Sequence, residues 1–411
     1  MKNRDVFIAS AARTPIGNFG GTLKDMGAVE MGIHAVRAAL ERAFGSLPPE
    51  RKPGEAGLEK WPFGWKIDEV IIGNAREAGV GPNPARQVAW RAGLGDDTPA
   101  FTVNMACASG LQTVALAAQR IGLGEAEMIV AGGMESMSRV PYMFDARWGV
   151  KMGHQPLVDG MYRDGFLCPI SEMIMGETAE LLADQYKIGR EEQDEYALES
   201  QRRAARATAE CHLKAELAPI DIRDRSGKVT RFEHDEHVRD DVKPESLAKL
   251  KPVFRKTGTV TAGNSSGITD GAAALVLVSG DKVKELGIKP LARVSDASIA
   301  AVDPRIMGIG PVPAVRKLEE RTGRKLADYD LVELNEAFAA QVLACDRELH
   351  FDRERMNPNG GAIALGHPIG CTGARILTTL VHELRRRGGR WGLATLCVSG
   401  GLGMALEIEA V

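Results

Sequence analysis

Two cysteines of this chain stand where a thiol can do chemistry, because each comes at the end of an apolar, strand-like stretch. Cys107 follows FTVNMA and opens an alanine-rich helical pattern. Free N–H groups and the dipole at a helix N-terminus favour a thiolate, which is a nucleophile. Cys397 follows LATL and precedes Ser399-Gly400-Gly401, where backbone N–H groups are exposed. A buried cysteine more often serves only in packing, so a nucleophilic role requires a neighbouring base.

A histidine in a glycine-rich turn is the candidate base. His367 lies in a Gly-His-Pro turn, in which the glycine lets the backbone approach a ligand and the proline removes a donor. Asn335 follows the apolar stretch Leu331 to Leu334, so its carboxamide can point into a crevice at the carboxyl ends of the strands. These residues indicate a cysteine nucleophile with a histidine base.

Two further patterns favour other chemistry at first sight. Gly263 to Gly267 matches the G-x-S-x-G elbow of serine hydrolases, with Ser265 as nucleophile, but the strand expected before it, Thr257 to Thr261, is short and polar. His234-Asp-Glu-His237 offers metal-ligating side chains within a run of charged residues, where such side chains are usually hydrated. We therefore expect no serine nucleophile and no metal site.

The elements that position these residues alternate between strands and helices. Strands are predicted at 6–9, 69–72, 101–103, 128–131, 272–279, 331–334, 393–396 and 404–408, and helices at 29–44, 109–122, 178–186, 190–207 and 372–387. This alternation is typical of a layered α/β fold with a largely parallel sheet. Residues 139–175 have no clear period, and 46–65 is predicted to be a surface insertion without an assigned role.

Composition excludes several classes of protein. Glycine accounts for 46 of 411 residues, about 11%, against a typical ~7%, so many turns are expected. The net charge of -3 offers no global footprint for nucleic acid or an anionic membrane. No apolar run approaches the roughly 18 residues of a membrane span. The six cysteines include no C-x-x-C pair, and we expect free thiols in a cytoplasmic protein.

Seven stretches together carry a family resemblance. They are SAARTPIGNFGG at Ser10, NMACASG at Asn104, GGMESMS at Gly132, TVTAGNSSGITDGAAA at Thr259, NEAFA at Asn335, GGAIALGHPIGCTGAR at Gly360 and CVSGGLG at Cys397. With these motifs in family order over essentially its whole length, the chain resembles the thiolases, a family of acetyl-CoA acetyltransferases and 3-ketoacyl-CoA thiolases.

The resemblance implies an α/β thiolase fold of two related βαβαβαββ halves in a five-layer αβαβα arrangement. Residues 1–137 would form the N-terminal half, completed by 269–289, and 290–411 the C-terminal half. Residues 138–268 would form an inserted loop domain that binds coenzyme A.

The resemblance also implies an acyltransferase that catalyses reversible Claisen condensation and thiolysis of 3-ketoacyl-CoA through an acyl-cysteine. Cys107 would be the nucleophile, activated by His367, and Cys397 the second acid and base. His367 and a water held by Asn335 would form one oxyanion hole, and the N–H groups of Cys107 and Ser399 the other. The alternatives are a ketoacyl synthase-like condensing enzyme, the serine hydrolase described above, and a catalytically silent acyl-CoA-binding module.

Coenzyme A contacts transfer by the same resemblance. They are Ser266, Arg239, Ser246, Phe254, Met175 and Phe338. The partners implied are acyl-CoA and CoA as substrates, without a cofactor, nucleic acid or membrane insertion, in a homotetramer or homodimer. The chain departs from enzymes specialised for acetoacetyl-CoA at Ile174, where they carry histidine, and Ser399 stands where many members have glycine.

Overall fold

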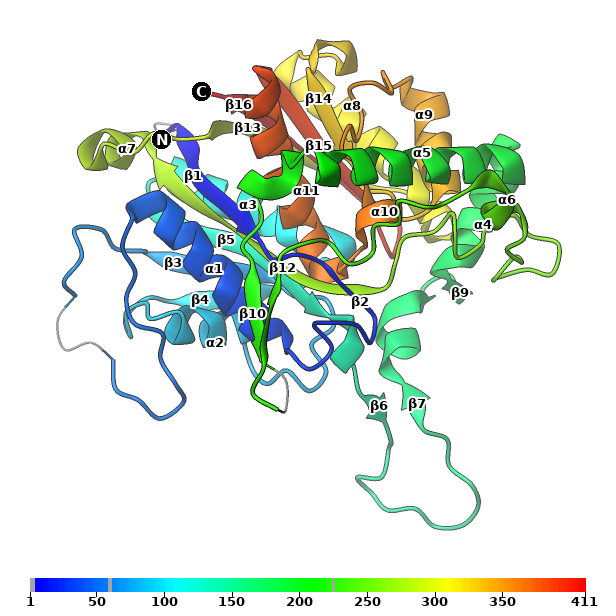
Figure 1. Ribbon diagram of the computed structural model, residues 1–411, viewed down its shortest axis with the longest axis horizontal. Coiled ribbons are helices and arrows are strands. Elements are labelled where there is room, and N and C mark those ends of the chain that lie inside the picture. The colour runs from blue at the N-terminus through cyan, green and yellow to red at the C-terminus, as the bar shows by residue number, and fades with distance from the viewer. Residues whose placement is uncertain (1–3, 58–60, 224–225) are drawn as a thin grey trace.

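One mixed sheet runs through the protein and holds both halves together (Figure 1). The computed structural model describes residues 4–57, 61–223 and 226–411. Within these residues the strand order is β14-β15-β16-β13-β1-β12-β5-β3-β4, and the short β2 (Gly17–Asn18) pairs with β12. The half-sheets join where Val6 to Ile8 of β1 pair with Ala292 to Val294 of β13.

The N-terminal half contains five main strands and the helices between them. Its elements are β1 (Val6–Arg13), α1 (Ala28–Phe44), β3 (Glu69–Gly73), α2 (Pro84–Arg91), β4 (Ala100–Val103), α3 (Ser109–Gly122), β5 (Met128–Ser136) and β12 (Thr269–Ser279). Although β12 follows β5 only after a long excursion, it lies between β5 and β1 and is buried along its whole length. A short helix, α7 (Gly280–Leu286), leads to the other half.

The C-terminal half repeats this plan, but one of the five strands is reduced to a single bridge. Its elements are β13 (Ala292–Ala301), α8 (Pro311–Thr322), β14 (Leu331–Leu334), α9 (Ala339–Leu349), α10 (Ala362–Leu365), α11 (Ile369–Arg387), β15 (Trp391–Val398) and β16 (Leu402–Ala410). Beside β14, where β4 lies beside β3 in the other half, a single parallel bridge joins Val332 and Met356. The charged, proline- and asparagine-containing stretch around Met356 suits a loop better than a strand.

The sheet is mixed, so the prediction of a largely parallel sheet is wrong. Among the strands of the described residues, the parallel pairs are β3–β4, β3–β5 and β14–β15, whereas β12 is antiparallel to both of its main neighbours. The pair β15–β16 is a hairpin closed by three residues, Ser399 to Gly401, and so short a connection permits only antiparallel strands.

Helices α3 and α11 form the middle layer between the half-sheets. Both pack on β5 and β12, and α11 also packs on β14 and β15. The two helices approach so closely that a Cβ on Gly110 would lie 2.7 Å from the backbone nitrogen of Ala374, and one on Gly373 would collide with Leu111. Helices α1 and α2 cover the outer face of one half-sheet, and α8 and α9 that of the other. The expected five-layer arrangement is thereby confirmed.

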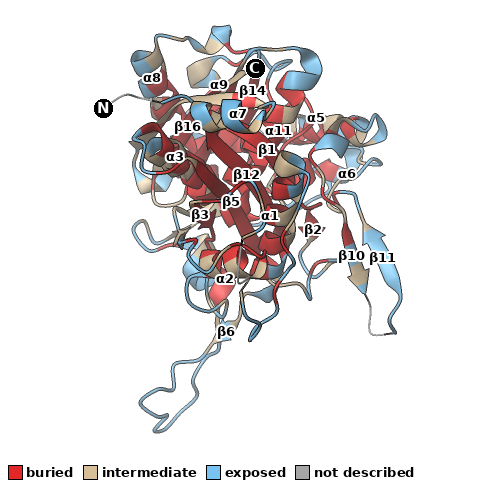
Figure 2. Ribbon diagram, turned by 90° about the vertical axis from the view of Figure 1, so that its left-hand side faces the viewer, coloured by how far each residue is buried: buried red, intermediate tan, exposed pale blue. Residues whose placement is uncertain are grey.

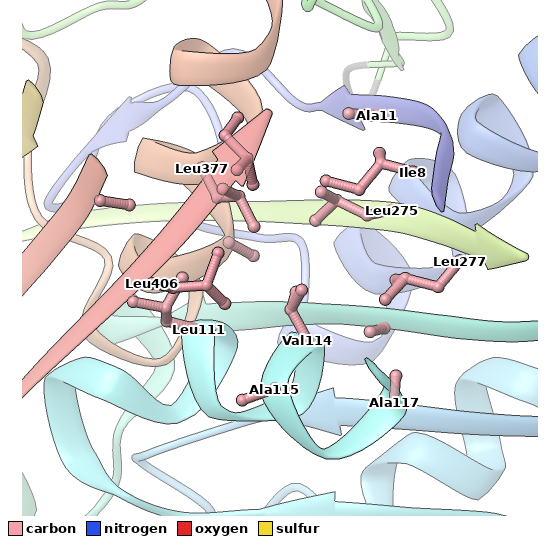
Figure 3. Close-up of a cluster of buried hydrophobic side chains, with 14 of the residues drawn as sticks. Ile8, Ala11, Leu111, Val114, Ala115, Ala117, Leu275, Leu277, Leu377 and Leu406 are labelled. Atoms are coloured by element: carbon pink, nitrogen blue, oxygen red, sulfur yellow. The ribbon is translucent and has the colours of Figure 1, made fainter. Parts of the chain in front are cut away.

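The largest core lies between the half-sheets, around the middle helices. Figure 3 shows Ile8 of β1, Leu275 and Leu277 of β12 and Leu377 of α11 in one cluster, with Leu111 and Val114 of α3 beneath them. Figure 2 shows the strands of the central sheet largely buried and the outer faces of the peripheral helices exposed. This packing gives the loops at one edge of the sheet a rigid support.

The region between β5 and β12 contains short hairpins and two long helices. Its elements are β6 (Tyr142–Met143), β7 (Val158–Asp159), β8 (Leu167–Cys168), β9 (Met173–Ile174), α4 (Met175–Tyr186), α5 (Arg190–Ala209), β10 (Ile220–Arg223), β11 (Val229–Phe232) and α6 (Pro244–Ala248). The β6–β7 hairpin projects away from the body (Figures 1 and 2). In the described part of the chain, no helix combines the length and apolar character needed to cross a bilayer.

The insertion at 46–65 packs against the body through aromatic rings. Trp65 stacks on Phe44 of α1 with ring centroids 4.3 Å apart, and Trp61 meets Trp65 edge to face at 5.4 Å. The Arg51 guanidinium lies 4.4 Å from the centroid of Trp90, a cation–π contact. The prediction of a surface insertion holds for the described residues of this stretch; residues 58–60 lie outside them.

Candidate active site

Cys107 sits in a strained turn between β4 and α3. The turn is a single 3-10 segment, Ala106–Ala108, and Ala106 has a φ of +45°, a left-handed conformation that non-glycine residues rarely adopt. The Asn104 side chain accepts a hydrogen bond from the Ala106 N–H (3.0 Å), and the Ser109 hydroxyl donates to the Ala106 carbonyl (2.7 Å). Backbone strain held by surrounding contacts is a feature of functional sites.

The surroundings raise the pKa of the Cys107 thiol, whereas its place at a helix N-terminus predicted a lowered pKa. Burial raises the pKa of the partly buried thiol more than the positive charge of Arg76 and the N–H of Ser399 lower it. The prediction that the helix N-terminus favours the thiolate is therefore wrong in net direction, because removal from water outweighs the nearby donors. A base must take the proton.

His367 is held as a neutral imidazole with one defined tautomer. Its Nδ1 lies 2.6 Å from the Thr372 hydroxyl, whose own proton is donated to the Pro368 carbonyl at 3.0 Å. With the hydroxyl proton donated to Pro368, the hydroxyl oxygen accepts from Nδ1–H, and Nε2 keeps its lone pair. Burial, with the charges of Arg375 and Arg76, lowers the pKa of His367 to about 3. An uncharged imidazole with a free nitrogen is able to act as a base.

The turn that presents His367 depends on Gly366. This residue has a φ of +101°, and a Cβ there would lie 2.5 Å from the Thr269 methyl group. The neighbouring His367 N–H donates to the Gly267 carbonyl at 3.0 Å. The glycine was predicted to let a ligand approach, whereas here the space beside it is filled by the first residue of β12.

Cys397 approaches Cys107 from the opposite half. It lies near the end of β15, paired with Gly403 of β16, and is fully buried. Burial raises the pKa of the Cys397 thiol well above its ordinary value, and the nearby Cys107 sulfur raises it further. Ser399, two residues on, directs its N–H to the Cys107 sulfur. The structure thus brings together the two thiols and the Ser399 donor named from the sequence.

Asn335 is a buried amide with unused hydrogen-bonding capacity. It follows β14, and its backbone N–H donates to Thr395 of the neighbouring β15 at 3.0 Å. Among the described residues, neither its side-chain oxygen nor its side-chain nitrogen has a hydrogen-bond partner. Leaving such a buried group unpaired costs about 1–3 kcal/mol, so its retention favours a functional role.

Three of the residues assigned to coenzyme A lie in one apolar cluster with Cys397. Phe254 and Phe338 meet edge to face with centroids 6.3 Å apart, and Met175 packs in the same group. Ser266 is attached to this group because its N–H donates to the Ala337 carbonyl at 3.0 Å. Arg239 and Ser246 are exposed.

The structure also explains the two patterns that suggested other chemistry. The Ser265 hydroxyl donates to the Thr261 carbonyl at 2.7 Å, and residues 257–261 form no strand, so the expected short strand is wrong and the elbow geometry is absent. In the HDEH stretch, Asp235 binds the buried Arg13 at 2.7 and 2.8 Å, and His237 contacts Asn18 at 2.6 Å. Within the described residues, no three such side chains gather as a metal site.

Sequence reasoning missed the residues that support the site from behind. Thr372 sets the His367 tautomer, and its position on the helix that follows the Gly-His-Pro turn was the available signal. Glu135, within the quoted GGMESMS motif, is fully buried and accepts hydrogen bonds from three consecutive loop residues, Asn74 to Arg76, and from Gly370 of α11. Its contacts are long-range, so no local spacing indicated them.

Two layered α/β halves that contribute facing thiols, a neutral histidine and a buried amide define a class of enzyme that works by covalent thiol catalysis. Residues 55–281 match the thiolase N-terminal domain family, and residues 288–410 match the thiolase C-terminal domain family. The chain therefore belongs to the thiolase family, and it is an acyltransferase of that family.

Individual relatives agree over the full length. An acetyl-CoA acetyltransferase of Chromobacterium violaceum is 47% identical over 98% of this chain and 99% of its own. The Bacillus anthracis acetyl-CoA acetyltransferase structure superposes with a TM-score of 0.93 at 47% identity, covering 100% of both chains. A human mitochondrial 3-ketoacyl-CoA thiolase in complex with CoA gives a TM-score of 0.91 at 42% identity, covering 100% of this chain and 99% of its own.

Proposed function

We propose that this thiolase interconverts 3-ketoacyl-CoA plus CoA with acetyl-CoA plus a shortened acyl-CoA, using Cys107 and Cys397 in turn. The observation that carries this assignment is the meeting of the two thiols: the Cys107 sulfur lies close enough to raise the pKa of Cys397 and receives the Ser399 N–H. One thiol alone could form an acyl-enzyme, but exchange of a carbon–carbon bond also needs an acid and base at the α-carbon.

In thiolysis, His367 takes the proton of Cys107 at Nε2, and the thiolate adds to the C3 carbonyl of the substrate. The C2–C3 bond breaks, the acyl group stays on Cys107, and Cys397 protonates C2 to release acetyl-CoA. Thiolate Cys397 then deprotonates the incoming CoA, whose sulfur attacks the acyl-cysteine. Cys107 leaves and recovers its proton from His367. Condensation is the same sequence reversed.

Two donor sets stabilise the negative oxygens. The N–H groups of Cys107 and Ser399, which reach the Cys107 sulfur, would stabilise the thioester oxygen. A protonated His367 Nε2, with a water bound by the unpaired Asn335 amide, would stabilise the enolate oxygen. Donors of this kind are each worth on the order of 10² to 10³ in rate.

Coenzyme A is the group we assign to the surface beside Cys397. Phe254, Phe338, Met175 and Ser266 would line the pantetheine arm. Phe254 and Phe338, packed edge to face, and Met175 offer an apolar surface to it. Arg239 and Ser246 are exposed, as contacts to the nucleotide end require. The loop domain, residues 138–268, would supply most of these contacts, and the bound CoA of the human relative supports this choice of ligand. No separate cofactor or metal enters the proposed cycle.

Assembly and location complete the proposal. The projecting β6–β7 hairpin exposes large apolar side chains, with Trp148 and Met152 each 92% exposed. Exposed apolar surface of this kind marks protein contacts, which supports a homotetramer, with a homodimer as the smaller form. Light scattering on the purified protein measures which is present. We assign the enzyme to the cytoplasm, where thiols stay reduced.

Labelling with radioactive acetyl-CoA tests the two thiol roles separately. Wild type and Cys397→Ala should both acquire label, whereas Cys107→Ala should not, because only Cys107 forms the thioester. Cys397→Ala should lose carbon–carbon exchange by at least about 10³-fold, since the α-carbon then lacks its base. Ser265→Ala is the matched control and should retain both activities. Full thiolysis by Cys107→Ala would contradict the assignment.

A further inference from the structure

One buried carboxylate connects the loop that carries the nucleophile with the loop that carries the base. Glu135 is the penultimate residue of β5 and is fully buried. Its Oε1 accepts from the Asn74 side chain at 2.6 Å and from the Arg76 N–H at 3.0 Å. Its Oε2 accepts from the Ala75 N–H at 3.3 Å and from the Gly370 N–H at 2.8 Å.

Two of these contacts, those with Ala75 and Gly370, lead toward the proposed catalytic residues. On one side, the Ala75 carbonyl accepts from the Asn104 side chain at 3.3 Å, and Asn104 in turn accepts from the Ala106 N–H beside Cys107. On the other side, Gly370 lies in the first turn of α11, three residues after His367. Glu135 is therefore the common point of two short chains of contacts.

All four groups around the carboxyl are hydrogen-bond donors. An ionised carboxylate accepts all of them, whereas a protonated carboxyl replaces one acceptor position with a donor and loses at least one contact. Resting on the proposed roles of Cys107 and His367, we propose that Glu135 is a positioning residue. Its ionised carboxylate holds the turn that carries Cys107 and the turn that carries His367 in the relative position that acylation requires.

Burial makes the ionisation of the Glu135 carboxyl responsive to pH near neutrality. Burial raises the pKa of Glu135 to about 7, against the opposing effects of Arg76 and the backbone donors of Gly370, Arg76 and Ala75. The Glu135 charge in turn raises the pKa of Cys107, before α3, and of Cys371, in α11. On the neighbouring β12, Asp270 lies opposite Ser136 and accepts from the Ser138 N–H at 2.9 Å, so it is engaged elsewhere.

The acid limb of the pH–rate profile, which is the fall in acylation rate as the pH is lowered, distinguishes the role of Glu135 from that of His367. Because the pKa of His367 is about 3, its protonation does not enter between pH 5 and 8. Protonation of Glu135 would enter there, so Cys107 acylation should slow below pH 7 and approach a tenfold loss per pH unit. The limb would belong to a residue that touches neither substrate nor thiol proton.

Single-turnover acylation by acetyl-CoA between pH 5.5 and 8.5 tests the inference. Glu135→Gln should acylate about 10- to 100-fold more slowly than wild type at pH 8 and should lack the limb near pH 7, because a neutral amide cannot titrate and holds the loops less well. Glu135→Asp should restore a limb. Asp270→Asn, which removes a neighbouring buried carboxylate outside the two contact chains, should keep the wild-type limb.

A second variant covers the case in which Glu135→Gln does not fold. Asn74→Ala keeps the carboxylate but removes its shortest donor, so the acid limb should move to higher pH. An unchanged limb in Asn74→Ala, or in a folded Glu135→Gln, overturns the inference. Failure of wild type to acylate at any pH would instead contradict the proposed function itself.

Discussion

Nδ1 of His367 lies at a hydrogen-bond distance of 2.6 Å from the hydroxyl of Thr372, five residues further along the chain. Because that hydroxyl donates its own proton to the Pro368 carbonyl at 3.0 Å, its oxygen accepts from Nδ1–H, which leaves Nε2 as the basic nitrogen. Thr372 thus selects which imidazole nitrogen is available to take the Cys107 proton in the proposed cycle.

Thr372→Val removes this acceptor while nearly preserving the side-chain shape. We expect kcat/KM to fall by about 10- to 100-fold, because the tautomer and the ring orientation are no longer held, and the unpaired Nδ1–H to cost about 1–3 kcal/mol of stability. Steady-state thiolysis and thermal unfolding measure the two effects. Thr372→Ser keeps the hydroxyl and should stay within a few-fold of wild type; an equal loss in both variants would assign the effect to packing.

His367 should make the folded protein sensitive to acid. Its pKa is lowered from 6.5 to about 3 on folding, so below pH 6.5 the unfolded chain binds a proton that the folded chain does not. The stability associated with the neutral ring is fully present above pH 6.5 and is lost progressively as the pH falls toward 3, amounting to about 2 kcal/mol at pH 5. Urea unfolding at several pH values measures this loss.

The matched comparison is His367→Gln, which has no group titrating in that range. Between pH 7 and pH 5, the unfolding free energy of wild type should fall by about 2 kcal/mol more than that of His367→Gln. Contributions of other groups, including Glu135, are common to both proteins. A constant difference across the range would show that His367 keeps an ordinary pKa.

Gly366→Ala should damage both stability and catalysis. The substitution combines a φ of +101° with a contact of 2.5 Å to the Thr269 methyl group, so we expect a cost above about 2 kcal/mol and displacement of His367. Gly388→Ala is the control, because Gly388 caps the same helix α11 with a φ of +67° and its Cβ would meet no atom within 4 Å. It should cost about 1 kcal/mol and leave the acylation rate unchanged. Similar effects of the two variants on acylation would argue against a special turn at Gly366.

The spacing of apolar residues along the chain predicted many of the helices and strands. The predicted helix at 109–122 matches α3 at both ends, and the predicted strand at 331–334 matches β14. The predicted strand at 128–131 stops short, because β5 continues through glycines to Ser136. Those glycines look like a turn in sequence, but a Cβ on Gly133 would collide with the Gly370 carbonyl of α11, so the close approach of a helix requires them in the strand.

The sequence by itself determined the family and the candidate residues Cys107, His367, Asn335 and Cys397, because each lies in a short motif whose residue types are legible without the fold. Only the tertiary structure decided the state of those residues. The pKa of Cys107 rises because burial outweighs its donors, and the His367 tautomer follows from the direction of one hydrogen bond. Glu135 and Gly370, 235 positions apart, meet only because β5 and α11 pack together. Burial, charge and hydrogen-bond direction arise from contacts between distant segments, which residue spacing along the chain does not encode.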